Sequence, residues 1–104
     1  MRDINQEEWR ELIAKDDNAE ILDVRTPEEH DEGYIADAKL IDIQQPQVFM
    51  DEVEKLDKSK NYYIYCRSGG RSSQACQILD QMGFENTYNL IGGFSNWEGE
   101  RKTS

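Results

Sequence analysis

One cysteine in this chain stands where a strand pattern ends and a glycine-containing loop begins. Cys66 follows the β-branched and aromatic run at residues 62–65 and precedes Gly69 and Gly70. Apolar residues at helical spacing follow, and they predict a helix over residues 72–82. Backbone N–H groups of such a loop converge on one point, and a helix N-terminus adds partial positive charge there. The pattern therefore predicts a cysteine held as a thiolate, which is a nucleophile.

The shift that this requires in the cysteine pKa is within reach of ordinary interactions. A free cysteine with a pKa near ~8.5 is only about 3% thiolate at pH 7, and lowering the pKa by ~2 units takes ~2.7 kcal/mol. A helix end contributes about 0.3–1 kcal/mol and a hydrogen bond to a charged acceptor about 1.5–3 kcal/mol. We expect the loop amides, with Arg67 or Arg71, to supply the shift. The alternative is a buried, inert cysteine, which leaves the paired glycines and arginines unexplained.

The length of the loop separates sulfur chemistry from phosphate chemistry. Loops of the tyrosine-phosphatase type space the cysteine and the arginine as C-x5-R, whereas here Arg71 follows Cys66 with the spacing C-x4-R and Ser72 takes the next position. The shorter ring encloses less volume, which suits one extra sulfur atom on the cysteine better than a phosphate. A G-x4-G-K-[ST] phosphate-binding string does not occur in the sequence either.

Four segments in order resemble the motifs of the rhodanese (thiosulfate sulfurtransferase) family, specifically its single-domain members. They are the D-V-R-x-x-x-E segment at 23–29, the G-H-I-x-G-A element at 33–38, the C-R-S-G-x-R-S loop at 66–72 and the terminal G-G-x-x-x-W at 92–97. The resemblance covers nearly the whole chain. Tyr34 stands where the family usually has histidine, and Asp37 replaces a glycine. Both departures lie outside the loop and concern local packing more than activity.

This resemblance implies a sulfurtransferase in which Cys66 accepts sulfane sulfur as a persulfide. The expected donor is thiosulfate, a persulfide or a polysulfide, and the expected acceptor is cyanide, a small thiol or an acceptor protein. The residues expected to bind the persulfide sulfur are Arg67, Ser68, Gly69, Gly70, Arg71 and Ser72. Asp23 and Arg25 straddle a strand end, where they either support the pocket or form an ion pair that braces the loops. No organic cofactor and no metal are expected.

Two other functions share features with this interpretation. A persulfide carrier or binding module would use the same loop without rapid turnover, and the sequence does not separate it from an enzyme. A phosphatase or arsenate reductase would use a similar loop. The C-x4-R spacing and the absence of a nearby general-acid signature disfavour the phosphatase or arsenate reductase.

Composition and charge restrict the partners and the compartment. The chain has 104 residues and a formal net charge of −10, which argues against nucleic acid because phosphates would be repelled. The charged N-terminus is unlike a signal peptide and no run reaches transmembrane length, so we expect a cytoplasmic protein without a membrane partner. Two cysteines and one histidine indicate neither a disulfide framework nor a zinc site.

The elements that must position the loop alternate between strands and helices. Strands are predicted at 2–4, 20–24, 39–43, 62–65 and 86–90, and helices at 5–13, 27–30, 47–56, 72–82 and 94–97. Such alternation predicts an α/β fold of the rhodanese-like type, with a mainly parallel central sheet of about five strands and helices on both faces. Ligands of these folds bind beyond the carboxyl ends of the strands, which is where Cys66 lies. We expect one domain over 1–104, with a frayed tail at 98–104.

The second cysteine, the single histidine and the two tryptophans are predicted to have structural rather than catalytic roles. Cys76 is too far along the predicted helix to form a disulfide with Cys66 and is expected to pack on the flank of that helix. His30, between Glu29 and Asp31, is expected on a solvated helix face. Trp9 and Trp97 are expected to pack in the core and at its edge.

Overall fold

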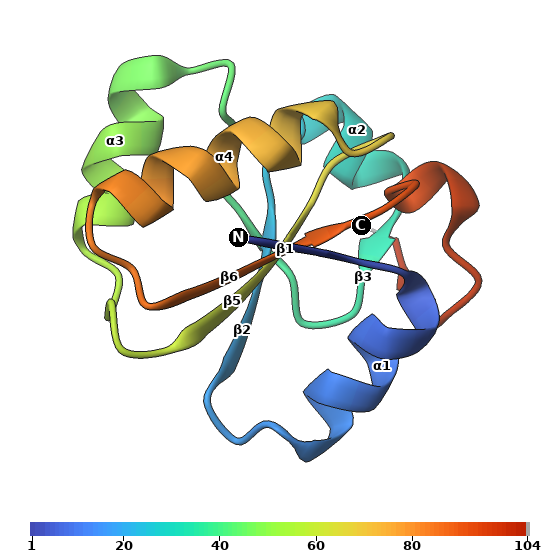
Figure 1. Cartoon of the computed structure of the whole chain (residues 1–104). Coiled ribbons are helices and arrows are strands. Elements are labelled where there is room, and N and C mark those ends of the chain that lie inside the picture. The colour runs from blue at the N-terminus through green and yellow to red at the C-terminus, as the bar shows by residue number, and fades with distance from the viewer. Residues whose placement is uncertain (104) are drawn as a thin grey trace.

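The computed structural model describes residues 1–103 and contains a five-stranded, parallel sheet covered by helices on both faces (Figure 1). Its strand order is β1-β6-β5-β2-β4. The strands are β1 (Arg2–Ile4), β6 (Asn86–Leu90), β5 (Asn61–Tyr65), β2 (Ala19–Asp23) and β4 (Lys39–Leu40). The helices are α1 (Gln6–Lys15), α2 (Pro27–Glu32), α3 (Pro46–Glu54) and α4 (Gly70–Gln81), and a 3-10 turn, η1, spans Phe94–Asn96. The predicted fold class is confirmed.

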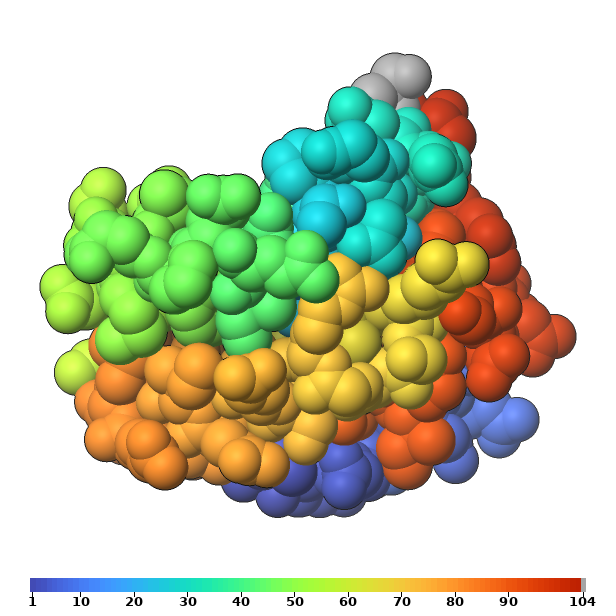
Figure 2. Space-filling model, turned by 90° about the horizontal axis from the view of Figure 1, so that it is seen from above, coloured from blue at the N-terminus to red at the C-terminus, as the bar shows by residue number. Residues whose placement is uncertain are grey.

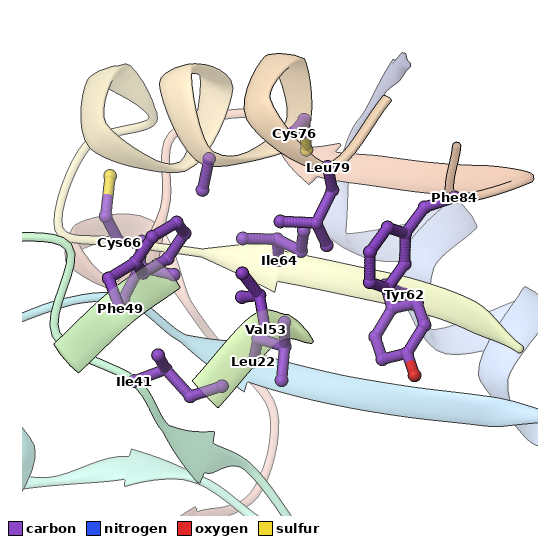
Figure 3. Packing of buried hydrophobic residues seen from close by; sticks show 12 residues of the cluster. Leu22, Ile41, Phe49, Val53, Tyr62, Ile64, Cys66, Cys76, Leu79 and Phe84 are labelled. Carbon is purple, nitrogen blue, oxygen red and sulfur yellow. The ribbon is translucent and has the colours of Figure 1, made fainter. Parts of the chain in front are cut away.

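The central strand β5 divides the core into two layers because successive side chains of a strand point to opposite faces. Tyr62 and Ile64 point to the face covered by α3 and α4, and Cys66, just beyond the strand, continues that series (Figure 3). Tyr63 and Tyr65 point to the other face, which α1 covers. The side chain of Cys66 therefore lies on the same face of the sheet as α4, the helix that follows the cysteine loop.

The strands predicted at 2–4 and 86–90 form over those residues, and the other helix and strand ends lie within three residues of the predicted ones. The Asn5 side chain accepts a hydrogen bond from Glu8 N at 2.9 Å and caps α1, the helix predicted from residue 5. The carboxylate of Glu8 does not complete a capping box, because it pairs with Arg2 instead. The strand predicted over 39–43 ends at Leu40, because the side chain of Asp42 accepts from Gln44 N at 2.8 Å and turns the chain.

The structure contains a second, two-stranded sheet that the sequence analysis does not predict. β3 (Tyr34–Ile35) pairs in antiparallel fashion with β7 (Arg101–Lys102). Arg101 and Lys102 are thus part of a strand, whereas the sequence analysis assigns them to a frayed tail; residue 104 of that tail lies outside the described residues. The segment leading to β7 is held by Trp97, whose indole N–H donates to Glu100 O at 3.1 Å.

The parallel strands bring their carboxyl ends to one edge of the sheet. Asp23 ends β2, Tyr65 ends β5 and Leu90 ends β6, so the segments that follow these three strands meet there. Figure 2 shows that the yellow segment beginning α4 lies between α2 in cyan and the red segment beyond β6 (Figure 2). No helix within residues 1–103 has the length and apolar character needed to cross a membrane.

Candidate active site

Cys66 lies at the mouth of a tight loop between β5 and α4. The residue is 1% exposed, and its Sγ accepts a hydrogen bond from Gly69 N at 3.1 Å. Gly69 has a φ of 112°, a left-handed conformation that glycine adopts without strain, and α4 begins at the next residue. Figure 3 shows the side chain of Cys66 pointing from the end of β5 toward the start of α4. The structure thus brings the thiol to a helix N-terminus, as the sequence predicts.

Hydrogen bonds rather than charges dominate the ionisation of this thiol. Burial acts to raise the pKa of Cys66, but it is outweighed by the hydrogen bonds that an ionised Sγ accepts from the Ser72 side chain and from the N–H groups of Ser72, Gly69 and Ser68. The net effect is a pKa below the ordinary cysteine value. The loop amides expected to stabilise a thiolate are therefore in position.

Arg71, one of the two arginines expected to support the thiolate, is paired with an acidic residue of α2. Its guanidinium donates to both carboxylate oxygens of Glu29, at 2.7 and 2.9 Å. The pKa of Arg71 is raised chiefly by this hydrogen bonding, and to a smaller degree by the charge of Cys66. Its influence on the thiolate is therefore a longer-range electrostatic one.

Glu29 connects the loop to α2 through two sets of contacts. Besides binding Arg71, its carboxylate accepts from Thr26 N at 3.2 Å, while Glu29 N donates to the Thr26 hydroxyl in a reciprocal capping box. The hydrogen bond from Arg71 is the largest cause that lowers the pKa of Glu29, to about 2. This acidic residue was not identified as a site residue from the sequence, although it is the last position of the D-V-R-x-x-x-E segment.

Asp23 is the centre of a buried polar cluster beneath the loops. Its carboxylate is fully buried and accepts from Arg25 Nε at 2.9 Å and from another Arg25 nitrogen at 2.7 Å. Tyr65 donates its hydroxyl to the same carboxylate at 3.0 Å. Arg25 also donates to Gly33 O at 2.7 Å, so the ion pair braces the segment after α2. The bracing ion pair considered for Asp23 and Arg25 is present in the structure, and Arg25 also lines the cavity described below.

His30 belongs to this cluster and is not on a solvated helix face, so that prediction is wrong. Its Nδ1 lies 2.8 Å from Asp23 Oδ2, and because a carboxylate only accepts, Nδ1 carries the proton. The ring stacks on Tyr34, with centroids 4.1 Å apart. The tyrosine that replaces the family's usual histidine thus covers His30. Asp37, which replaces a glycine, has a φ of 69° and keeps the left-handed backbone of that position.

A cavity of about 330 Å³ opens beside the loop, and arginines line much of it. Its lining residues are Arg25, Glu29, Glu32, Arg67, Phe94, Ser95 and Arg101. The ring of Phe94 has the guanidinium of Arg25 at 4.5 Å and that of Arg101 at 4.8 Å from its centroid. Arg67, the residue after Cys66, therefore borders a hollow in which arginines outnumber glutamates.

The segment Gly92–Gly93 and η1 hold the outer side of the loop. Phe94 N donates to Cys66 O at 2.9 Å and Ser95 N donates to Arg67 O at 3.0 Å. A Cβ on Gly93 would lie 2.6 Å from both of these carbonyl oxygens, so only glycine allows the approach. The paired glycines in the sequence are the signal of this contact, which the sequence analysis noted as a motif without its structural role.

Ser72 and Asn89 complete the inner side of the loop. The Ser72 Oγ lies 3.4 Å from Cys66 Sγ and 2.5 Å from Asn89 Oδ1. Asn89 Nδ2 donates to Asp3 Oδ1 at 2.9 Å. Asn89 and Asp3 were missed by the sequence analysis, because nothing in the sequence indicates that β1 lies next to β6.

The second cysteine is part of the core. Cys76 is fully buried, and burial is the main cause that raises its pKa, to about 12. Figure 3 shows its side chain among the apolar residues under α4. Among residues 1–103 no cluster of three or more His, Cys, Asp or Glu side chains is arranged to hold a metal ion.

Comparison with known proteins agrees with this geometry. The family model of the rhodanese-like domain matches residues 5–100. The chain belongs to the rhodanese family. A sulfurtransferase of Allochromatium vinosum is 35% identical over 97 residues, which cover 93% of this chain and 88% of the relative. The thiosulfate sulfurtransferase GlpE of Coxiella burnetii is 38% identical over 98 residues, covering 94% of this chain and 87% of the relative.

Solved rhodanese structures have the same fold. The crystal structure of a rhodanese-like domain protein from Staphylococcus aureus superimposes with a TM-score of 0.85 at 31% identity, and the match covers 100% of this chain and 99% of that one. The parallel five-stranded sheet and its covering helices are thus those of a rhodanese domain. The rhodanese resemblance stated from four sequence motifs is confirmed.

Proposed function

We propose that the protein is a sulfurtransferase that accepts sulfane sulfur on Cys66 as a persulfide and passes it to a thiol or to cyanide. The observation that carries the proposal is the hydrogen bonding of Cys66 Sγ. The sulfur accepts from Gly69 N at 3.1 Å at the start of a helix, and its pKa is lowered by the loop. A thiolate in a ring of amides is the starting state that sulfur transfer needs.

In the first half-reaction the Cys66 thiolate attacks the outer sulfur of thiosulfate, a persulfide or a polysulfide. A new S–S bond forms to Sγ while the S–S bond of the donor breaks, and the electron pair of that bond leaves with sulfite or with the donor thiolate. No proton is required, because the nucleophile is already ionised and sulfite is a stable anion. The product is a Cys66 persulfide whose terminal sulfur carries the negative charge.

In the second half-reaction an acceptor thiolate or cyanide attacks the terminal sulfur. The bond between that sulfur and Sγ breaks, and its electron pair returns to Sγ, which becomes the thiolate again. The acceptor leaves as a persulfide or as thiocyanate. Hydrogen bonds from the loop to sulfur lower the energy of both charged states, the thiolate and the persulfide.

The charge around the loop favours an anionic donor in a chain whose net charge is −10. Arg67 borders the cavity beside Cys66, together with Arg25 and Arg101. These three arginines outnumber the two glutamates of the cavity, Glu29 and Glu32, so they favour the approach of an anion such as thiosulfate. We assign the donor-binding role to this cavity.

The orientation of Arg71 supports sulfur transfer over phosphate chemistry. In a phosphate-binding loop the arginine would turn inward to bind the oxyanion. Here two guanidinium nitrogens of Arg71 instead donate to Glu29, which lies outside the loop. The shorter C-x4-R ring points the same way.

Intact-protein mass spectrometry after incubation with thiosulfate tests the proposal. Wild type is expected to gain one sulfur atom and to lose it again on addition of cyanide, whereas Cys66→Ser is expected to gain none. Cys76→Ser is the matched control and is expected to behave as wild type. Sulfur on Cys76, or no loading by thiosulfate, polysulfide or a small persulfide, would reject the mechanism. Loading without turnover in the presence of cyanide or thiols would identify a persulfide carrier instead.

A further inference from the structure

Four side chains form a hydrogen-bonded series that runs from the edge of the sheet to the reactive sulfur. Asp3 on β1 contacts Asn89 on β6, Asn89 contacts Ser72 on α4, and Ser72 contacts Cys66. Asn89 is 5% exposed and Ser72 is fully buried, so water has little access to the middle of the series. The direction of each hydrogen bond can therefore be worked out from the chemistry of the groups.

The orientation of the Asn89 amide is set by Asp3. A carboxylate only accepts hydrogen bonds, so the group of Asn89 that lies 2.9 Å from Asp3 Oδ1 is the NH2 group. The amide oxygen then faces Ser72. Asp3 and Asn89 are partners in the register of β1 and β6, which keeps the two side chains next to each other.

The amide oxygen of Asn89 in turn accepts the one hydrogen bond that the Ser72 hydroxyl can donate. Two oxygens at 2.5 Å need a proton between them, and because the amide oxygen has none, the Ser72 hydroxyl donates. The Ser72 hydroxyl also lies 3.2 Å from Gly69 O, which is likewise only an acceptor. In this orientation Ser72 offers Cys66 a lone pair, which suits a neutral S–H at 3.4 Å and not a thiolate.

We propose that Asn89, fixed by Asp3, is a positioning residue that governs whether the Ser72 hydroxyl donates to Cys66 Sγ. When Sγ is a thiolate, the hydroxyl rotates about its C–O bond from Asn89 to Sγ; no bond to hydrogen breaks. When Sγ is a thiol or the inner sulfur of a persulfide, the hydroxyl returns to Asn89. The inference rests on the proposed function for its role in catalysis, because the release of sulfur regenerates the thiolate on Sγ.

This arrangement makes Asn89 a competitor for the hydrogen bond that stabilises the thiolate. Ser72 is the first of the groups that lower the pKa of Cys66, yet it can donate to Sγ only by giving up Asn89. Removing the amide oxygen should therefore strengthen the donation to Sγ. The charged groups around this network are Arg67 in the loop, Arg71 on α4, Glu29 on α2 and Asp3 on β1, and the variants below leave all four unchanged.

A double-mutant cycle on Cys66 ionisation tests the proposal. The probe is iodoacetamide, and the readout is the apparent pKa from the alkylation rate against pH, measured in the Cys76→Ser background. Asn89→Leu removes both polar groups at similar volume and is expected to lower the Cys66 pKa by about half a unit to one unit. Ser72→Ala is expected to raise it by about one unit. In the Ser72→Ala background, Asn89→Leu is expected to leave the apparent pKa of Cys66 unchanged.

The matched control is Asn86→Leu, the same substitution at the exposed start of β6, where the side chain contacts Asn61 instead. Its Cys66 pKa is expected to equal that of wild type. Asn89→Val serves as a second variant if Asn89→Leu folds poorly. An unchanged or raised pKa in both Asn89 variants, or a shift that persists without the Ser72 hydroxyl, would overturn the positioning role.

The outcome is independent of the sulfur-transfer test. If the pKa pattern appears but wild type gains no sulfur from any donor, the proposed function fails while Asn89 still directs Ser72. If sulfur loads on Cys66 but the cycle shows no coupling, only the role of Asn89 is rejected.

Discussion

Arg71 and Glu29 form a two-pronged ion pair that joins the first turn of α4 to the N-terminus of α2. Both side chains are about one-quarter exposed, at 24% each. The arginine of the cysteine loop is thereby held away from the sulfur by a residue 42 positions earlier in the chain. The pair fixes the start of α4 against α2. Because Arg71 is held there, hydrogen bonds are the main interactions that stabilise the thiolate.

Replacing Glu29 by Gln should destabilise the fold in a pH-dependent way. The pKa of Glu29 is lowered from 4.5 to about 2, so the carboxylate contributes stability that is fully present above pH 4.5 and is lost as the pH falls toward 2. With allowance for partial exposure, we expect Glu29→Gln to reduce the free energy of unfolding at pH 7 by about 1–2 kcal/mol. Urea unfolding at pH 7 and pH 3 measures this. The neighbouring exposed Glu28→Gln is the control, and equal losses in the two variants would contradict the ion-pair argument.

Ser72 should matter more to Cys66 ionisation than Arg71 does. The Ser72 side chain leads the hydrogen bonds that lower the pKa of Cys66, whereas Arg71 is paired with Glu29. We expect Ser72→Ala to raise the apparent pKa more than Arg71→Ala does, and a distant charge change such as Glu100→Gln to leave it unaltered. The pH dependence of alkylation ranks the three variants. A larger rise for Arg71→Ala would show that the arginine leaves Glu29 in solution.

Arg67 should affect the anionic donor and spare a neutral reagent. Its side chain lines the cavity beside Cys66, so Arg67→Gln is expected to slow loading by thiosulfate about tenfold, a cost typical of one charged contact. The rate of alkylation by neutral iodoacetamide at pH 9 should change less than twofold, an estimate for an intact thiolate. Arg2→Gln, an exposed arginine paired with Glu8, is the control. Equal slowing of both reactions would mean that Arg67 acts on the thiol itself.

Gly93→Ala should disrupt the loop from its outer side. The added Cβ would lie 2.6 Å from the carbonyl oxygens of Cys66 and Arg67, and displacing reacting groups by ~1 Å costs on the order of a hundredfold in rate. Gly83→Ala is the matched control. It has a φ of 95° but nothing within 4 Å of the added Cβ, so it shares the backbone strain without the contact. If the two variants transfer sulfur equally well, the close approach at Gly93 does not position the loop.

Inserting a glycine between Gly69 and Gly70 should change the chemistry that the loop supports. The insertion creates the C-x5-R spacing and moves the Gly69 amide, which donates to Sγ at 3.1 Å. We expect sulfur transfer to fall sharply, by on the order of a hundredfold, and phosphate or arsenate to protect Cys66 from alkylation. A glycine inserted next to Gly83, at the other end of α4, controls for the effect of insertion on folding. Retained sulfur transfer without oxyanion binding would remove loop length as the determinant.

The features that the sequence predicts correctly are those with a local cause. The run before Cys66, the glycines after it, Asn5 before α1 and Pro27 at the start of α2 are local signals, and the corresponding elements form there. The contacts that the sequence does not predict depend on tertiary pairing. His30 meets Asp23, and Asn89 meets Asp3, only because separate strands and loops converge at one edge of the sheet.

Short strands and partner choice account for the remaining differences. β3 and β7 have two residues each, too few for an alternating pattern to be recognised. The sequence likewise places Arg71 near the end of the cysteine loop, but it does not show which of the many carboxylates Arg71 binds. With 22 acidic residues in the chain, charge alone could not select Glu29.

The pairing of β1 with β6 has a consequence for how the protein matures. Arg2 lies beside Tyr88, and Ile4 lies beside Leu90, so β1 pairs with a strand that is far from it in the sequence. The same late segment provides Asn89 for the loop and, shortly beyond it, the N–H groups of Phe94 and Ser95. Contacts between residues so far apart in sequence form slowly, because the entropy of loop closure is lost before they form. A folding chain in which β6 has not yet joined the sheet would therefore lack this support of the Cys66 loop, so the loop would reach its final geometry only late in folding.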